Sequence, residues 1–405
     1  MRYIRRAAEK TAWEMAKHFP VLLVTGPRQV GKTTMLQNIA EKGRRYISLD
    51  DPVARNLAVS DPGLFLQRYQ PPVIIDEIQY APQLLPYIKL YVDEHKTKGD
   101  FWLTGSQVFY LMKGVSESLA GRVGIINMRG LSYSEIIGAE SAAFKMDRET
   151  LLLKATRRPA LQLANLFNLI LKGSMPTLYT DEQELEPFFA SYMQTYLQRD
   201  VKDLTQVGDE MIFFRFVTCL AARTGQLLNL SDVARDTGIS QPTAKQWLSI
   251  LVSSGLVYLL EPYYNNILKR LIKTPKLYFL DTGLCAYLTR WITAESLEAG
   301  AMSGAFFETW VVAEIVKSYY NAGQRPPLYF YRDKDQQEVD VLIQANNILY
   351  PLEIKKSVNP GPQAGRHFKT LAKTKQPIGT GGIICLYSDL LPLDRNNWLV
   401  PVGLL

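Results

Sequence analysis

The chain contains few of the residues that form disulfides or bind metals through sulfur and imidazole. It has three cysteines and three histidines among 405 residues. The cysteines Cys219, Cys285 and Cys385 lie far apart, and no two histidines stand at a spacing typical of metal ligands. A scattered, odd-numbered set of cysteines argues against a disulfide framework and against a zinc site. We therefore expect reduced thiols and a cytoplasmic protein.

The sequence also lacks long apolar runs. No stretch approaches the roughly 18 apolar residues that indicate a transmembrane helix. Residues 1–6, Met-Arg-Tyr-Ile-Arg-Arg, lead into a polar helical pattern and not into the apolar segment of a signal peptide. We therefore expect no membrane partner.

The remaining composition is that of a globular protein with an excess of positive charge. Hydrophobic residues make up 47% of the chain and charged residues 21%, with a formal net charge of +7. This length gives room for about two to four domains. The basic balance favours an anionic partner such as nucleic acid only weakly, because a mildly basic protein without such a partner has the same charge.

The pattern of apolar residues divides the chain into four parts and predicts a multidomain α/β protein. Residues 1–140 begin with a helical segment and then alternate apolar strand runs with helices, which is typical of a parallel sheet. Residues 141–225 lack strand signals and predict several helices, and residues 226–270 fit a small helix-turn-helix unit. Residues 271–405 return to a mixed pattern, with a long helix near 304–320 followed by short strands. The strands predicted in the first part are Val21–Thr25, Tyr46–Leu49, Val73–Ile75, Phe101–Thr104 and Val123–Asn127.

The first of these strands runs into a phosphate-binding motif. Residues 26–33, Gly-Pro-Arg-Gln-Val-Gly-Lys-Thr, match GxxxxGK[ST], and a helical run follows. Glycines let the backbone N–H groups curl around phosphates, and the helix start adds its positive dipole end. Lys32 is expected to reach the β- and γ-phosphates, and the Thr33 hydroxyl to bind Mg²⁺. The residues predicted to bind the nucleotide are Gly26, Pro27, Arg28, Gln29, Val30, Gly31, Lys32, Thr33, Thr34 and Ser106. No Asn-Lys-x-Asp motif for guanine occurs, which favours ATP.

A second apolar strand ends in two carboxylates, Asp76 and Glu77. Asp76 is predicted to hold Mg²⁺ from its second coordination shell, and Glu77 to orient and activate the attacking water. Phosphoryl transfer needs mainly positioning and neutralisation of charge, so these groups suffice for hydrolysis of ATP.

Two further features near this site have open roles. The strand that ends at Thr104 offers Thr104, Ser106 or Gln107 as the polar group near the γ-phosphate. Arg122 is either an arginine finger, acting across the subunits of a homo-oligomer, or a side chain that faces solvent.

Residues 230–248 have the pattern of a helix-turn-helix. Ser231 is predicted to cap the first helix, Gly238 to form the turn and Ser240 to cap the second helix, with Pro242 in its first turn. A wing strand is expected at Leu256–Leu260.

This unit either reads DNA or serves as a lid or protein contact. In a DNA-reading role the second helix presents polar side chains to the groove, and basic residues just beyond it add phosphate contacts. The side chains concerned are Gln241, Thr243, Lys245 and Gln246, followed by Lys269, Arg270, Lys273 and Lys276.

Carboxylates gather in the C-terminal part. Glu308 lies in a predicted helix, Asp340 in a predicted strand Val339–Ile343, and Glu353 and Lys355 in the next strand, Leu352–Lys355. Because side chains alternate along a strand, Glu353 and Lys355 point to one face, and pairing of the two strands brings Asp340 beside them. The three carboxylates would hold Mg²⁺, which would supply the nucleophilic water or neutralise the developing charge, and Lys355 would orient that water or stabilise the transition state.

The alternative is a structural cluster of ion pairs without a metal. Basic side chains can neutralise neighbouring carboxylates that would otherwise repel each other. The members of that cluster would be Glu338, Asp340, Glu353, Lys355, Lys356 and Arg332.

Several of these segments together resemble one bacterial and archaeal family of AAA-type ATPases with a C-terminal domain of uncharacterised function. They are residues 26–34, 76–79, 103–106, 121–122, 131–135, 273–284, 338–340 and 353–355. The resemblance implies an AAA-type core, a winged helix and a C-terminal domain similar to PD-(D/E)xK nucleases, although Val339 stands where the motif has proline. It favours an ATP-regulated enzyme acting on DNA. A non-nuclease ATPase switch or scaffold, or a ring-forming motor, remains open.

Overall fold

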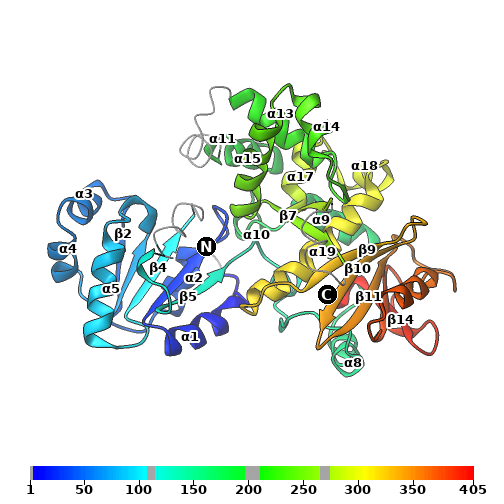
Figure 1. The fold of residues 1–405 in the computed structure, drawn as a ribbon, viewed down its shortest axis with the longest axis horizontal. Helices are drawn as coiled ribbons and strands as arrows, with labels where there is room; N and C mark the ends of the chain where they lie inside the picture. Colours follow the sequence, from blue (N-terminus) through cyan, green and yellow to red (C-terminus); the bar gives the residue numbers. More distant parts are fainter. Residues whose placement is uncertain (1–2, 107–114, 116, 197–209, 265–273) are drawn as a thin grey trace.

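A parallel five-stranded sheet forms the N-terminal part of the computed structural model (Figure 1). The structure describes residues 3–106, 115, 117–196, 210–264 and 274–405. The strands, in the order β2-β3-β4-β1-β5, are β1 (Val21–Thr25), β2 (Arg45–Ser48), β3 (Val73–Asp76), β4 (Phe101–Gly105) and β5 (Val123–Asn127). All five predicted strands are confirmed, with β2 one residue early and β3 and β4 one residue longer than expected.

Helices cover both faces of this sheet. They are α1 (Ala8–His18) and α2 (Lys32–Ile39), and α3 (Pro52–Ser60), α4 (Pro62–Arg68) and α5 (Leu84–His95). Side chains of β1 alternate between two cores, with Leu22 and Val24 in the core of α1 and α2, and Val21 and Leu23 in that of α3 to α5. A parallel sheet buried on both faces gives the continuous apolar runs seen in the sequence. The carboxyl ends of β1, β3 and β4 therefore meet at one edge.

The described residues between 141 and 225 form helices and no strand, as the pattern predicts. Together with a short helix before them, these are α7 (Tyr133–Ile136), α8 (Arg148–Arg157), α9 (Leu163–Lys172), α10 (Thr177–Thr180), α11 (Leu185–Tyr196) and α13 (Glu210–Ala221). Their apolar faces share one core with the α1 side of the parallel sheet. Their closest contacts are with later helices of the chain: α9 and α11 contact the helix Thr282–Leu288, and α13 contacts the helix Leu230–Thr237.

Two helices and a turn form where the helix-turn-helix pattern predicts them: α14 (Leu230–Thr237) and α15 (Gln241–Ser253). Gly238 ends α14 in the left-handed region at φ 74°, and the Ser240 hydroxyl accepts from the Thr243 N–H at 3.2 Å. The expected cap at Ser231 is wrong. Asn229 caps α14 instead, because the helix begins two residues earlier and the Asn229 Oδ1 accepts from the N–H groups of Ser231 and Asp232.

A mixed nine-stranded sheet occupies the other end of the molecule (Figure 1). Its strands, in the order β13-β14-β12-β11-β10-β9-β7-β8-β6, are β6 (Gln226–Leu227), β7 (Val257–Pro262), β8 (Lys276–Phe279), β9 (Leu328–Arg332), β10 (Glu338–Ala345), β11 (Ile348–Ile354), β12 (Gly381–Cys385), β13 (Leu391–Pro392) and β14 (Asn397–Pro401). The strand expected at Leu256–Leu260 is β7, which pairs antiparallel with β8 and parallel with β9. The strand that follows the helix pair is therefore part of the large sheet.

Three helices lie between β8 and β9: α17 (Thr282–Leu288), α18 (Ala294–Ala299) and α19 (Ser303–Asn321). The long helix predicted near 304–320 is α19, and it contacts both β5 and β8. Short 3-10 helices complete the fold at η1 (Ile78–Tyr80), η3 (Arg366–Thr374) and η4 (Val402–Leu404). Among the described residues, no helix has the length and apolar character needed to cross a membrane.

The two carboxylate-bearing strands, β10 and β11, form an antiparallel hairpin as predicted. Val341 lies opposite Leu352, and the turn residues Asn346 and Asn347 have φ values of 50° and 62°. Asparagine tolerates this left-handed backbone, which a two-residue hairpin turn requires. The hairpin fixes the register that places Asp340 next to the end of β11.

Candidate functional site

The phosphate-binding motif forms a tight loop between β1 and α2. Gly26 has φ 142°, and a Cβ atom added there would lie 2.0 Å from the carbonyl oxygen of Met128. Gly31 has φ 85° and directly precedes α2, while Gln29 has φ 60°. The loop therefore needs glycine at both ends, once for close backbone approach and once for the turn into the helix.

Lys32 lies over this loop and is nearly buried. Its Nζ donates to the carbonyl oxygens of Gly26 at 3.0 Å and Pro27 at 2.8 Å. The ammonium group thus already stands over the loop that is predicted to bind phosphates.

Asp76 is the centre of a hydrogen-bond cluster that joins four elements. Its Oδ1 accepts from the Thr33 hydroxyl of α2 at 2.7 Å and from the Thr104 hydroxyl of β4. Its Oδ2 accepts from the Tyr46 hydroxyl of β2 at 2.9 Å. Burial, together with the negative charge of Asp76, raises the pKa of Tyr46 to about 12, so the phenol remains a donor at neutral pH. The hydroxyl of Thr33 and the carboxylate of Asp76 are oxygen donors of the kind that Mg²⁺ prefers, and their contact fits the predicted ion.

Glu77 is held next to Asp76 by two polar side chains. It follows β3 in a left-handed backbone conformation at φ 57°. Its Oε2 accepts from the Gln79 side-chain amide and lies 3.4 Å from the Ser106 hydroxyl. Of the three candidates near the γ-phosphate, Thr104 contacts Asp76 and Ser106 contacts Glu77, while Gln107 lies outside the described residues.

The motif search missed Tyr46 and Gln79. Gln79 could have been found from its place two residues after Glu77, because a 3-10 turn folds that side chain back. Tyr46 has no such signal, since only the pairing of β2 with β3 brings it to Asp76.

Arg122 does not reach this cluster within the chain. Its guanidinium forms two bonds to Asp93 of α5, at 2.5 and 2.9 Å, at the protein surface. The role of an arginine finger therefore stays a prediction about a neighbouring subunit.

A pocket of about 260 Å³ adjoins the phosphate loop on the side of Gly31 and Thr34. Three segments line it: the N-terminal residues, the loop and α10. The lining residues are Tyr3, Ile4, Arg6, Gln29, Gly31, Thr34, Pro176, Thr177 and Thr180. Three of the predicted nucleotide-binding residues, Gln29, Gly31 and Thr34, lie in its wall.

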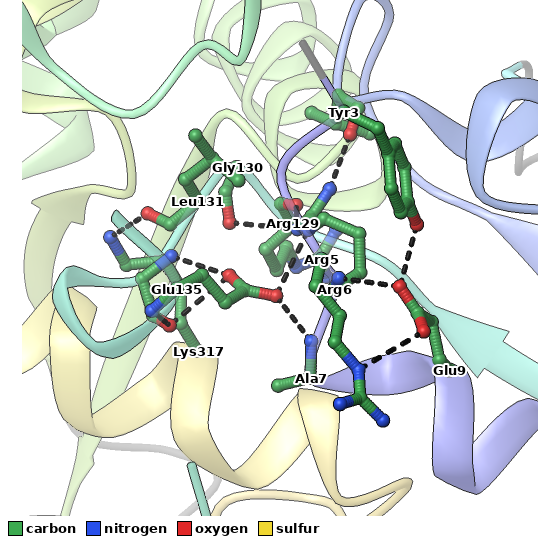
Figure 2. A network of polar contacts seen from close by, with 12 residues as sticks. Tyr3, Arg5, Arg6, Ala7, Glu9, Arg129, Gly130, Leu131, Glu135 and Lys317 are labelled. Atoms are coloured by element: carbon green, nitrogen blue, oxygen red, sulfur yellow. Dashed lines mark hydrogen bonds and ion pairs between the residues drawn. The ribbon is translucent and has the colours of Figure 1, made fainter. Parts of the chain in front are cut away.

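A buried ion pair ties the phosphate loop to the segment that follows β5 (Figure 2). Arg6 Nε donates to Glu135 Oε1 at 2.9 Å, while its two Nη groups donate to the carbonyl oxygens of Val30 and Arg129. The Glu135 carboxylate also closes a capping box with Ser132 at the start of α7. Burial by itself raises the pKa of Glu135, but the charge and hydrogen bonds of Arg6 outweigh it and leave that pKa below its ordinary value.

Helix α19 is attached to the same segment. Lys317 Nζ donates to the carbonyl oxygen of Leu131 at 2.8 Å, and Glu314 accepts from the Tyr133 N–H at 2.8 Å. Glu314 and Lys317 also form a buried ion pair with each other. The region after β5 therefore contacts the phosphate loop on one side and the C-terminal part on the other.

The predicted carboxylates of the C-terminal part do come together. Asp340 Oδ2 accepts from the Ile354 N–H at 2.8 Å, and Lys355 Nζ bonds Glu353 Oε1 at 2.6 Å. The other oxygen of Glu353 is buried without a hydrogen-bond partner in the described part of the chain. Burial, together with the charges of Glu308 and Glu353, raises the pKa of Asp340 well above its usual value.

Two residues of β8, Lys276 and Tyr278, complete this cluster. Lys276 Nζ lies 2.6 Å from Glu338 Oε1 and 3.2 Å from Glu308 Oε1, and the Tyr278 hydroxyl donates to the same Glu308 oxygen at 2.6 Å. The expectation that Lys276 contacts phosphate groups at the surface is wrong, because only 4% of the residue is exposed. The alternation of polar and apolar residues in Lys276-Leu277-Tyr278-Phe279 was the signal that Lys276 and Tyr278 share one face.

The two other members of the expected ion-pair cluster differ from each other. Arg332 belongs to it, with its Nε 3.7 Å from Glu338 Oε2. Lys356 turns away and bonds Glu298 and the Ser303 hydroxyl, each at 2.6 Å. Within the described ranges, no group of three or more His, Cys, Asp or Glu side chains is arranged to hold a metal ion.

The candidate DNA-reading side chains lie on α15. Gln241 donates to the Ser231 hydroxyl at 2.9 Å, and Thr243 bonds the Ser240 hydroxyl at 2.8 Å. Lys245 and Gln246 are exposed. The basic residues Lys269, Arg270 and Lys273 lie outside the described part of the chain.

Comparison with known proteins places three family matches along the chain. Residues 18–137 match an AAA domain, which contains the loop, Asp76 and Glu77. Residues 163–295 and 303–405 match two domains of unknown function, DUF8612 and DUF4143. The N-terminal sheet is therefore that of a P-loop AAA-type domain.

Relatives and a solved structure were also found. The walker-type ATPase paby2304 of Pyrococcus abyssi is similar at 13% identity over 69% of this chain and 94% of that chain, with a TM-score of 0.41, too low to support a conclusion. Uncharacterized proteins of Mycobacterium tuberculosis (Rv2008c) and Mycobacterium bovis (Mb2031c) are each 31% identical over 346 residues, which is 84% of this chain and 71% of the relative. The chain belongs to the family of these two mycobacterial proteins.

Proposed function

We propose that the chain is a Mg²⁺-dependent ATPase that acts at nucleic acid, with ATP binding and hydrolysis controlling the helix pair α14–α15 and the C-terminal module. The observation that carries the ATPase proposal is the convergence of Thr33, Asp76 and Glu77 beside the phosphate loop. These groups come from α2 and from the end of β3, within the part of the chain that matches an AAA domain.

Each side chain has a distinct task in this proposal. Lys32 exchanges its bonds to the loop carbonyls for phosphate oxygens, and Thr33 and Asp76 would hold Mg²⁺, which would neutralise the charge that develops on the phosphates. Glu77 accepts a hydrogen bond from the attacking water. Because Gln79 and Ser106 both contact Glu77 Oε2, the carboxylate has a defined orientation toward that water.

Support for a nucleic-acid partner comes from the helix pair. Two capped helices joined at Gly238 and followed by a strand fit a winged helix, and α15 exposes Lys245 and Gln246. The net charge of +7 is compatible with an anionic partner. A cytoplasmic location, and a homo-oligomer in which Arg122 acts across subunits, belong to the same proposal.

A second candidate is an ATPase switch or scaffold without nuclease activity. The grouping of Glu308, Asp340, Glu353 and Lys355 supports a nuclease-like C-terminal fold. The ammonium group of Lys276 among these carboxylates favours the non-cleaving alternative.

The test is ATP binding and turnover by the full chain, with and without duplex DNA. Lys32→Ala should lose nucleotide binding, since the loop loses its cation. Glu77→Gln should bind ATP as the parent does but turn it over at least about 100-fold more slowly, the lower range for removing a general base. Thr97→Ala, an exposed residue after α5, serves as the control and should match the parent. Equal turnover by Glu77→Gln and the parent would refute the role of Glu77. An absence of DNA binding at low salt would remove the nucleic-acid partner.

A further inference from the structure

Lys276 occupies the middle of the C-terminal carboxylate cluster, and we propose that its ammonium group is the resident cation of this cluster, in the place where the nuclease-like fold proposed above would bind a divalent metal. The proposal concerns the C-terminal module alone and does not depend on whether the chain hydrolyses ATP.

The first support is the position of Lys276 between two elements. It projects from β8 and lies 2.6 Å from Glu338 of β10 and 3.2 Å from Glu308 of α19. Only 6% of its side chain is exposed. A buried lysine is stable as a cation only with close carboxylate partners, so Lys276 and its two partners depend on each other.

The second support is that side chains of the protein already donate to a carboxylate oxygen of the cluster. Glu308 Oε1 accepts from both Lys276 and the Tyr278 hydroxyl. Glu308 Oε1, which Mg²⁺ or Mn²⁺ would need as a ligand, is therefore engaged by two protein donors, and a divalent ion placed among these carboxylates would stand next to a buried ammonium group. Like charges at such a distance repel strongly when water is excluded.

The third support is the balance of charge. Ion pairs join Glu308, Glu338 and Glu353 to the cations Lys276, Lys355 and Arg332, and Asp340 is the fourth carboxylate of the cluster. Three cations facing four carboxylates nearly neutralise the cluster without a metal, and Asp340 also accepts a backbone N–H. It follows that the C-terminal module keeps the arrangement of a nuclease but not its metal, and that it serves in binding or in structure and does not cleave.

The experiment measures Mn²⁺ binding by calorimetry and electron paramagnetic resonance, together with melting temperature in EDTA and in Mn²⁺. It uses the full chain carrying Asp76→Asn, which removes the predicted metal ligand of the ATP site. This parent should have no Mn²⁺ site that depends on Asp340, so adding Asp340→Asn should leave Mn²⁺ binding unchanged. Loss of a bound Mn²⁺ on adding Asp340→Asn would overturn the proposal.

The second arm removes the resident cation. Lys276→Met should melt at a lower temperature in EDTA, because its carboxylates lose their counter-charge, and should gain one Mn²⁺ site that restores the melting temperature. Adding Asp340→Asn should abolish this gained site. A Lys276→Met protein that is as stable as the parent in EDTA and gains no Mn²⁺ site would count against the proposal. If Lys276→Met does not fold, the comparison of the parent with Asp340→Asn decides the question alone.

Discussion

At the scale of single residues, the ATP site depends on side chains outside its recognisable motifs. Asp76 is bonded by Thr33 from the phosphate loop, but also by Tyr46 from the edge strand β2. Glu77 is held by Gln79, which belongs to neither motif. Contiguous strings such as the phosphate loop are visible in a sequence, whereas a contact between β2 and β3 depends on how strands pair. The motif residues could therefore be predicted, but the residues that form hydrogen bonds to them from elsewhere could not.

Tyr46→Phe tests one such support. The change removes the donor to Asp76 Oδ2 while keeping the ring. We expect unchanged nucleotide binding, a turnover reduced several-fold and a higher Mg²⁺ concentration for half-maximal activity, because the carboxylate loses an orienting bond. The measurement is ATP turnover as a function of Mg²⁺ concentration.

Tyr87→Phe on α5 is the matched control, because Tyr46 and Tyr87 are both 43% exposed. If Tyr46→Phe and Tyr87→Phe give the same Mg²⁺ dependence as the parent, Tyr46 has no part in positioning Asp76.

At the scale of elements, strands and long helices are predictable where nearly every residue of the segment is buried and apolar. The strands β1, β3 and β4 are buried along their whole length, and α19 has a long, nearly continuous buried run. The residue that caps a helix and the partners of a buried polar side chain are less predictable. Ser231 and Asn229 are both good capping residues, and the helix start selects Asn229. Lys276 resembled a surface lysine, since the sequence does not show that β8 lies beside α19.

Asn229→Ala tests the cap of α14. Two backbone N–H groups lose their acceptor, which costs about 1 kcal/mol, or roughly a fivefold rise in local opening. Hydrogen exchange of the amides in Leu230–Thr237 should accelerate by about that factor. Ser231→Ala, the cap that the sequence suggests, should change exchange in this helix much less. An equal effect of the two variants would contradict the assignment of Asn229.

At the scale of the whole molecule, the segment after β5 joins the phosphate loop to the C-terminal part. Arg6 and Glu135 connect this segment to the phosphate loop, and Lys317 connects it to α19 through the carbonyl oxygen of Leu131 (Figure 2). The capping box Ser132-x-x-Glu135 was visible in the sequence, but the pairing of Glu135 with a residue 129 positions earlier was not. Long-range ion pairs of this kind follow from the fold and leave no local pattern.

Acid should weaken this junction. The pKa of Glu135 is lower in the folded chain than its ordinary value, so its contribution to stability is complete above the unfolded pKa of about 4.3 and is lost as pH falls through the folded pKa. Thermal unfolding of the parent should therefore move to lower temperature as pH falls below about 5, and Glu135→Gln should lack this part of the acid sensitivity. A parent and a variant with parallel pH profiles would contradict this expectation.

Arg6→Met should be costly at neutral pH, by about 3–5 kcal/mol, because it leaves the buried Glu135 without its cation. Arg5→Met is the matched control: the Arg5 side chain is 88% exposed and its Nε lies 3.5 Å from Glu9 Oε2, so the pair is worth at most about 1 kcal/mol. The two variants can be compared by thermal unfolding and by ATP affinity. Equal stability of the two variants would show that the Arg6 pair is dispensable.

Strand β7 follows the helix pair α14–α15 directly and also belongs to the nine-stranded sheet, and this limits how the two parts can move. Three residues separate the end of α15 at Ser253 from the start of β7 at Val257, and β7 is bonded on both edges, to β8 and to β9. The helix pair α14–α15 is therefore connected rigidly to the nine-stranded sheet and not through a flexible linker. A displacement of α15 by a bound partner should therefore also displace the sheet that carries Lys276 and Asp340. We expect the helix pair and the C-terminal module to move together.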